Sequence, residues 1–257
     1  MSATRRDPPP QPARRTTAPA LPTSPAPGSL ITRRALAAGV GGLIAGTAAG
    51  AGAFNPNSAP ARRPPSAGEE LMTEHGVLKR ILLAYRAAAA QLSTGHTPPA
   101  GAIRDAAQII VDYVENFHEG LEEAYVFPRL VRAGQHADLV QTLLIQHDRG
   151  RHLTAAILST AGGDLHATQA KAALRTRLEQ FVRMYEPHEA WEDTSIYPAL
   201  RAVTAQPTLD DLAQRFAELE NRQFGDAALT QILGRVAGVE QQLGIADLTA
   251  FTPTGEA

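Results

Sequence analysis

The sequence contains no cysteine, few aromatic residues and little net charge, and each shortage limits the kinds of fold, site or partner that the protein can have. Without cysteine among 257 residues, the chain has no disulfide, no thiolate metal site and no cysteine nucleophile. Any metal ion would be held by histidine and carboxylate side chains, which suit iron, manganese and zinc. A formal net charge of −2 gives no argument for nucleic-acid binding. Aromatic residues make up 5% of the chain and apolar residues 44%, with alanine prominent, which favours helices.

The first 67 residues lack the apolar periodicity of a folded domain. Residues 1–30 are rich in Pro, Ala, Ser, Thr and Arg, which is typical of a disordered leader. The pair Arg33 and Arg34 then precedes an uncharged, Gly- and Ala-rich run over residues 35–54. Residues 55–67 predict a Pro-rich linker.

Twin arginines before a weakly hydrophobic run resemble a twin-arginine export signal, and Ala-Gly-Ala at residues 51–53 fits an A-x-A cleavage site. The pattern is incomplete, because Leu36 replaces the usual Phe and Ala38 stands where lysine is common. We expect export to the periplasm or beyond the cytoplasmic membrane, with membrane contact only through this segment. Two alternatives stay open, since residues 35–54 are long enough for a membrane anchor and also fit alanine-rich disorder.

From residue 68 onward, apolar residues recur with the period of amphipathic helices. Four helices are predicted, over residues 68–92, 100–127, 136–159 and 165–202. Joined by short loops, they predict an all-α, up-down four-helix bundle over residues 68–204. Residues 205–257 predict a C-terminal accessory helical hairpin, with amphipathic segments over 208–224 and 226–243.

A pattern of histidines and carboxylates occurs twice in the bundle, over residues 118–130 and 188–200. In each copy a histidine is followed by two glutamates, an aromatic residue, a proline and a leucine in the same register. A second pair, Glu74-His75 and Gln146-His147, recurs 72 positions apart. The bundle therefore consists of two halves with matching histidines.

The repeated residues have the spacing of metal ligands. Residues i and i+4 share one face of a helix, so His118 with Glu122, and His188 with Glu192, point together into the bundle. A histidine and a carboxylate one turn apart form a pair of ligands for a divalent metal ion. With one histidine from the first helix of each half, the predicted metal ligands are His75, His118, Glu122, His147, His188 and Glu192. Six protein ligands do not fill two octahedral shells, so bridging or exogenous small ligands take the remaining positions. We identify no separate catalytic residue and no residue for an organic cofactor.

The order His75, His118-x-x-x-Glu122, His147, His188-x-x-x-Glu192 resembles the hemerythrin-like HHE cation-binding family over residues 70–202. The resemblance implies a four-helix bundle around a non-haem di-iron centre with an oxo or hydroxo bridge. Members of that family carry oxygen, sense oxygen, redox state or iron, or act on nitric oxide or peroxide. The expected cofactor is therefore two iron ions, and the expected partner is a small molecule such as O2, NO or peroxide.

One position departs from the oxygen carriers of the family, which have a further histidine four residues after the ligand of the third helix. Arg151 stands there, and we expect it to pair with an acid such as Glu119 or Glu189. His152 lies one residue further, about 140° around the helix from His147. The missing histidine argues against simple reversible oxygen carriage.

Three functions remain open at this point. The favoured one is a di-iron protein that binds or senses a small oxidant or gas. The second is a peroxide- or NO-processing oxidoreductase on the same scaffold, and the third is a metal-storage or structural bundle. Tyr125, Tyr185 and Trp191 are expected in the core rather than in a redox relay, and no pattern indicates an oligomeric state.

Overall fold

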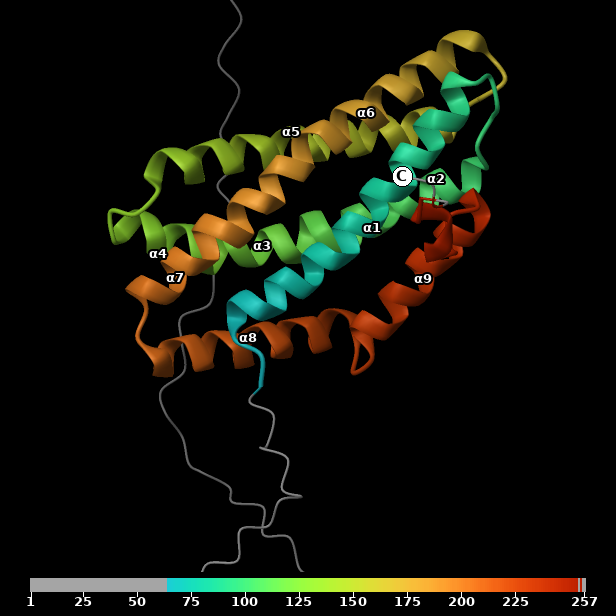
Figure 1. Cartoon of the computed structure of the whole chain (residues 1–257). Coiled ribbons are helices and arrows are strands. Elements are labelled where there is room, and N and C mark those ends of the chain that lie inside the picture. Colours follow the sequence, from blue (N-terminus) through green and yellow to red (C-terminus); the bar gives the residue numbers. More distant parts are fainter. Residues whose placement is uncertain (1–63, 254, 256–257) are drawn as a thin grey trace, which may run out of the picture. The chain divides into compact units, whose positions relative to one another are not determined.

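The computed structural model describes residues 64–253 and 255 (Figure 1). Within this part the chain forms helices and no strand, so the all-α prediction is confirmed. The predicted disordered leader and export signal lie outside the described residues, as does most of the predicted linker, and they stay predictions. None of the described helices is long and apolar enough to cross a membrane.

Four long helical segments form the bundle. The first is α1 (Ala67–Ser93) and the third is α5 (Ala137–Ala161). The second is an unbroken succession of α2 (Ala100–Ile109), η1 (Ile110–His118), α3 (Glu119–Leu121), η2 (Glu122–Val126) and α4 (Phe127–Arg132). The fourth joins α6 (Thr168–Trp191), η3 (Glu192–Ile196) and α7 (Tyr197–Val203). The predicted bounds agree with these to within a few residues, except that the second segment continues to Arg132.

The first helix begins where its sequence predicts a start. Ser66 accepts a hydrogen bond from the backbone N–H of Glu69, and the Glu69 carboxylate accepts one from the backbone N–H of Ser66 at 2.7 Å. This reciprocal capping satisfies two backbone donors that a helix N-terminus leaves free. Leu71, Leu78 and Tyr85 then follow on the buried face, which fixes the rotation of α1 and directs His75 inward.

A π-helical turn begins at each repeated carboxylate, Glu122 in η2 and Glu192 in η3. Each turn leads directly to a proline, Pro128 or Pro198, near the start of the next short helix. Proline lacks an N–H and clashes with the carbonyl four residues before it, so a straight α-helix cannot run through it without cost. The wider turn accommodates the proline, which explains why the second segment does not end near residue 127.

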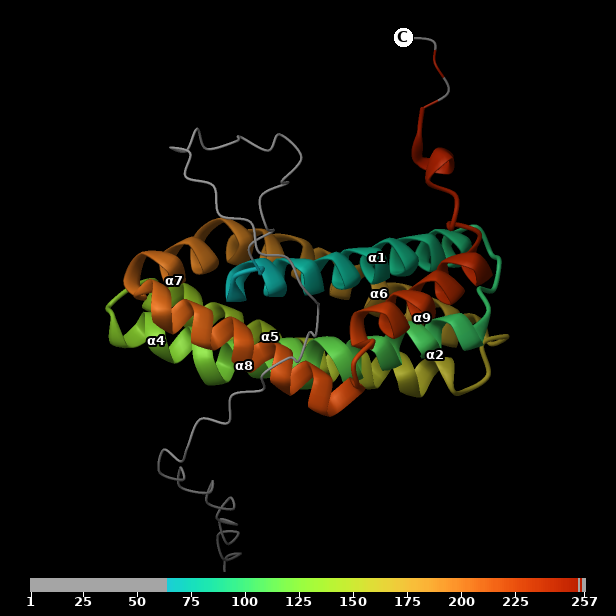
Figure 2. The ribbon, with the colours of Figure 1, turned by 90° about the horizontal axis from the view of Figure 1, so that it is seen from below.

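The accessory hairpin consists of α8 (Gln206–Phe224) and α9 (Ala228–Leu243), followed by the short η4 (Leu248–Phe251). Figures 1 and 2 show this hairpin alongside α1 and α2, away from α5. Its apolar side chains are buried against the bundle, among them Leu212, Phe216, Ile232, Val236 and Leu243. Arg80 of α1 and Glu240 of α9 form a bidentate ion pair, in which Arg80 Nε donates to Glu240 Oε1 at 2.7 Å. This pair holds α9 on α1.

Candidate metal centre

The structure brings the six predicted ligand residues together in the middle of the bundle. His75 comes from α1, His147 from α5, and each His–Glu pair lies on the helical segment between them or after them. All six are at most 3% exposed, whereas histidine and glutamate are ordinarily surface residues. The six residues are His75, His118, Glu122, His147, His188 and Glu192.

The four histidines form two pairs. The rings of His75 and His118 lie 4.7 Å apart between centroids, and those of His147 and His188 lie 5.0 Å apart. Each pair, with Glu192, presents three ligand atoms that lie within 4.8 Å of one another. Each pair of histidines, together with Glu192, could therefore hold a metal ion.

The two carboxylates lie between the histidine pairs. Glu192 places Oε2 3.3 Å from His75 Nε2 and Oε1 3.1 Å from His188 Nε2. Glu122 places Oε2 3.7 Å from His118 Nε2 and 3.5 Å from His147 Nε2. Each glutamate therefore approaches one histidine of each pair, which is the placement that lets a carboxylate bridge two ions.

Several of these atoms are buried and lack a hydrogen-bond partner within the described part of the chain. They are His147 Nε2, Glu122 Oε2, and both carboxylate oxygens of Glu192. A buried polar atom without a partner costs about 1–3 kcal/mol, so such a cluster needs another explanation. A cation accepting all of these lone pairs supplies it, and the residues present fit a site for one or two divalent metal ions.

In each of the four clustered histidines, the ring nitrogen Nδ1 contacts a carboxylate or an amide side chain from a neighbouring helix. Two of the acceptors precede the lone histidines, and two follow the ligand glutamates. The Nδ1 contacts are His75 to Asp193 at 2.8 Å, His118 to Glu74 at 2.8 Å, His147 to Glu123 at 2.9 Å and His188 to Gln146 at 2.9 Å. Such contacts place the proton on Nδ1 and leave Nε2 free to bind a metal ion.

The electrostatics of the cluster also favour a cation. Burial lowers the pKa of His118 well below its usual value, because the charged imidazolium is poorly solvated there. Burial raises the pKa of Glu122, and the neighbouring Glu192 raises it further. Two carboxylates in one dry site repel each other unless positive charge lies between them. His118 is therefore neutral, which is the form that binds a metal ion, and a divalent ion between the two carboxylates would offset their repulsion.

Comparison with known proteins agrees with this geometry. Residues 66–165 match the family described as the hemerythrin HHE cation binding domain, a span that includes His75, His118, Glu122 and His147. The chain is 42% identical over 229 residues to the uncharacterized protein Rv1995 of Mycobacterium tuberculosis, which covers 88% of this chain and 90% of the relative. It has the same identity and coverage with the uncharacterized protein Mb2018 of Mycobacterium bovis. The chain belongs to the hemerythrin HHE family. No solved structure matches the chain.

The position that holds a further histidine in oxygen-carrying hemerythrins is held here by an ion pair. Arg151 lies 2.8 Å from Glu119 and 2.6 Å from Glu123, so the predicted pairing with Glu119 is confirmed and Glu189 is not its partner. Glu189 instead pairs with Lys79 at 3.3 Å. His152 is 70% exposed in its side chain and turns toward Asp148, which places it outside the cluster.

Other expectations for single residues have mixed outcomes. Tyr185 is buried, and its hydroxyl donates to Glu119 at 2.8 Å. Tyr125 is half-buried against Phe216 of the hairpin. The expectation that Trp191 lies in the core is wrong, because it is 56% exposed. It sits one residue before Glu192, and a helix that turns Glu192 inward turns its neighbour by about 100°.

Sequence reasoning did not assign the four Nδ1 partners of this hemerythrin-type centre. Glu119, Glu123 and His147 also bring ligand atoms within 4.8 Å of one another, a group that the sequence did not indicate. A signal for the partners was present in the repeat, since Glu74 and Gln146 recur beside the lone histidines and Glu123 and Asp193 recur after the glutamates. Which histidine each one reaches depends on how the helices pack, and the sequence does not contain that directly.

Proposed function

We propose that the protein is a non-haem di-iron protein that binds or senses a small oxidant or gas such as O2, NO or peroxide. The observation that carries this proposal is the placement of Glu122 and Glu192, each between one histidine of both pairs. Four imidazoles and two carboxylates suit iron and leave part of each ion's shell to other ligands. Iron, when bound, supplies the capacity to take up such a small molecule and to exchange electrons with it.

The surrounding residues determine how that site behaves. The four Nδ1 acceptors fix the ring orientations, so that the Nε2 atoms already converge before a metal ion arrives. Burial of Glu122 and Glu192 keeps bulk water away and strengthens their attraction to a cation. Such a dry site suits a small uncharged or singly charged ligand better than a large substrate.

The ion pairs of Arg151 support binding or sensing over simple oxygen carriage. Arg151 is directed to Glu119 and Glu123, so it supplies no lone pair to the cluster. One ion therefore has one imidazole fewer than in the oxygen carriers. An extra open position favours firm binding of a small ligand or its reaction over rapid reversible exchange.

Metal content and an optical spectrum test the proposal. The purified full chain is expected to hold about two irons and, after oxidation, to show an oxo-to-iron charge-transfer band in the near ultraviolet. Glu122→Ala removes one shared carboxylate and is expected to lose most of the iron and the band. Glu218→Ala, at a half-exposed carboxylate on α8, serves as the control and is expected to retain both.

Two outcomes would overturn the proposal. One is a native chain that holds zinc or no metal, which would favour a structural or storage bundle. The other is iron that remains at two per chain in Glu122→Ala. Peroxide or NO turnover that needs Glu122 would assign the processing activity in place of binding or sensing.

We also propose that the chain is exported by the twin-arginine route. The support is the sequence pattern around Arg33 and Arg34, together with a site that must assemble from four separate helical segments and hence from a folded chain. Changing both arginines to lysine is expected to leave the protein in the cytoplasm. Unchanged yield outside the cytoplasmic membrane would rule out this signal.

A further inference from the structure

The two halves of the centre differ in one aromatic residue. Phe127 and Tyr197 hold the same place in the repeat, five residues after Glu122 and Glu192. Phe127 stacks on His147 with ring centroids 5.6 Å apart and an angle of 28°. Tyr197 stacks on His75 at 5.6 Å and 29°. The two rings are thus placed alike, and the hydroxyl of Tyr197 is the difference between them.

That hydroxyl lies among the ligand atoms. Tyr197 Oη is 3.2 Å from His75 Nε2, and it donates to Glu122 Oε1 at 2.9 Å. Two atoms that bind one octahedral ion at right angles, each about 2.1 Å from it, lie about 3 Å apart. The distances of Tyr197 Oη from both neighbours, 3.2 and 2.9 Å, are close to the spacing expected between adjacent ligands of a shared ion.

We propose that Tyr197 is a seventh protein ligand and binds the ion held by His75 and His118. This inference rests on the metal centre of the proposed function. On binding, the oxygen forms its bond to the metal ion and the phenol proton leaves for solvent, as is usual when protein ligands bind metal. The resulting phenolate is a hard, anionic ligand suited to ferric iron.

The two ions then have different numbers of protein ligands, and this difference indicates which of them binds the small molecule. The ion at His75 and His118 gains an oxygen ligand, while the ion at His147 and His188 meets only the ring of Phe127. The small molecule therefore binds at the His147–His188 ion. Tyr197 also covers the side of the centre that contains His75.

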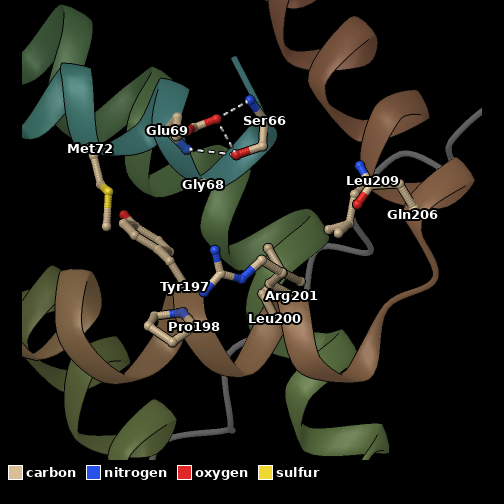
Figure 3. A pocket seen from close by; sticks show the side chains of 10 residues that line it. All are labelled: Ser66, Gly68, Glu69, Met72, Tyr197, Pro198, Leu200, Arg201, Gln206 and Leu209. Carbon is tan, nitrogen blue, oxygen red and sulfur yellow. Dashed lines mark hydrogen bonds between the residues drawn. The ribbon is translucent and has the colours of Figure 1, made fainter. Parts of the chain in front are cut away.

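A pocket of about 180 Å³ borders Tyr197 on its other side (Figure 3). Gly68, Met72 and Arg201 are among the residues that line it. Tyr197 is only 4% exposed there. The same side chain thus lines the pocket and reaches the ligand cluster.

The test uses the full chain loaded with iron and oxidised. A phenolate bound to ferric iron gives a visible charge-transfer band, and excitation in that band enhances the ring vibrations of the phenolate in the Raman spectrum. Tyr197→Phe is expected to lose both signals while iron stays at about two per chain. Tyr113→Phe is the matched control, since this buried tyrosine donates to Glu220 on α8.

The outcomes separate this inference from the proposed function. Two irons per chain with no phenolate signal in the unchanged protein, or a signal that survives Tyr197→Phe, would overturn the ligand assignment and leave the di-iron proposal standing. A chain without iron would overturn both.

Azide, a small anion that binds ferric iron, tests where the open position lies. Phe127→Tyr places a second phenol beside His147, and we expect it to weaken azide binding more than tenfold. Tyr197→Phe removes the oxygen ligand of the other ion, so we expect it to bind azide at least as tightly as the unchanged protein. Azide binding that is unchanged in a folded, iron-loaded Phe127→Tyr protein would contradict the assignment of the open ion.

Discussion

The two halves of the bundle agree in their candidate metal ligands and differ in the residues that surround them. Each half supplies one lone histidine and one His–Glu pair, yet Glu74 of the first half corresponds to Gln146 of the second, and Lys79 to Arg151. The accessory hairpin lies against α1 and α2 and away from α5 (Figure 1). The chemistry of a metal site can thus stay symmetric while its electrostatic setting does not. Four predictions test whether these differences matter.

The largest expected effect concerns the packing of the second half. A Cβ added at Gly150 would lie 1.8 Å from the hydroxyl oxygen of Tyr185, whereas the corresponding position of the first half is a buried Leu78. We expect Gly150→Ala to lower the free energy of unfolding by about 3 kcal/mol, because Tyr185 cannot move without disturbing the core. Chemical denaturation of the metal-free protein measures this.

The rescue variant for that prediction is Gly150→Ala combined with Tyr185→Leu, which removes the clashing atoms. It is expected to regain part of the lost stability. A Gly150→Ala protein as stable as the unchanged chain would show that the two halves pack with similar tolerance.

The next effect concerns Glu119 and Glu189, two buried glutamates that pair with Arg151 and Lys79. Arg151 pairs with Glu119 and Glu123, while Lys79 pairs with Glu189 alone and its side chain is 53% exposed. Arg151→Ala is expected to lower the free energy of unfolding by about 2 kcal/mol and Lys79→Ala by about 1 kcal/mol or less, because both sites are partly screened by solvent. Urea unfolding of the metal-free variants compares them, and equal losses would contradict the difference between the halves.

A third prediction exchanges the Nδ1 partners. Glu74→Gln removes the negative charge beside His118, and we expect metal affinity to fall about tenfold because a carboxylate at Nδ1 raises the basicity of a histidine that binds metal. Gln146→Glu is expected to act in the opposite direction at His188. Competition with a metal chelator measures both, and the double exchange should restore an affinity near that of the unchanged chain if the halves are equivalent in this respect.

The smallest effect is a pH dependence of stability that is confined to the first half, against which the accessory hairpin packs. Burial and the neighbouring Glu220 raise the pKa of Glu70 to about 7, whereas the corresponding Thr142 is exposed. A carboxyl group whose folded-state pKa is raised favours the folded state at low pH, and this contribution is lost as the pH rises toward 7.

Glu70→Gln is therefore expected to be more stable than the unchanged chain at pH 8, by about 1 kcal/mol after allowing for solvent at this half-buried group. The advantage should shrink toward pH 5. Thermal unfolding of the metal-free proteins at both pH values, with Glu218→Gln as the exposed control, would reject the idea if the advantage did not change with pH.

The sequence predicted the helices and the clustering of six histidine and glutamate residues because both are periodic features of a chain. The apolar period located the four bundle helices and the hairpin, and the repeat at 70 and 72 positions located six residues that the structure brings together. The identity of the Nδ1 partners could not be predicted in the same way. His75 meets Asp193, 118 positions away, and only the packing of α1 against the fourth segment determines that contact.

Local geometry accounts for the remaining differences. The second bundle helix was expected to end near residue 127, but the π turn before Pro128 carries the segment onward to Arg132. Trp191 was expected in the core on hydrophobicity, but the inward rotation of Glu192 turns it to solvent. In both cases a backbone or ligand requirement outweighs the preference of a single side chain.

The π turns also decide which way the aromatic rings face. In a regular α-helix, a residue five positions after a glutamate lies about 140° away around the axis and turns from the glutamate's face. A π turn closes with hydrogen bonds between residues five apart, so the fifth residue returns close to that face. Tyr197 and Phe127 therefore stand over the histidines only because η3 and η2 are wider than an α-helical turn. Returning either segment to α-helical register would rotate its ring out of the centre while leaving the six predicted histidine and glutamate ligands unchanged in sequence.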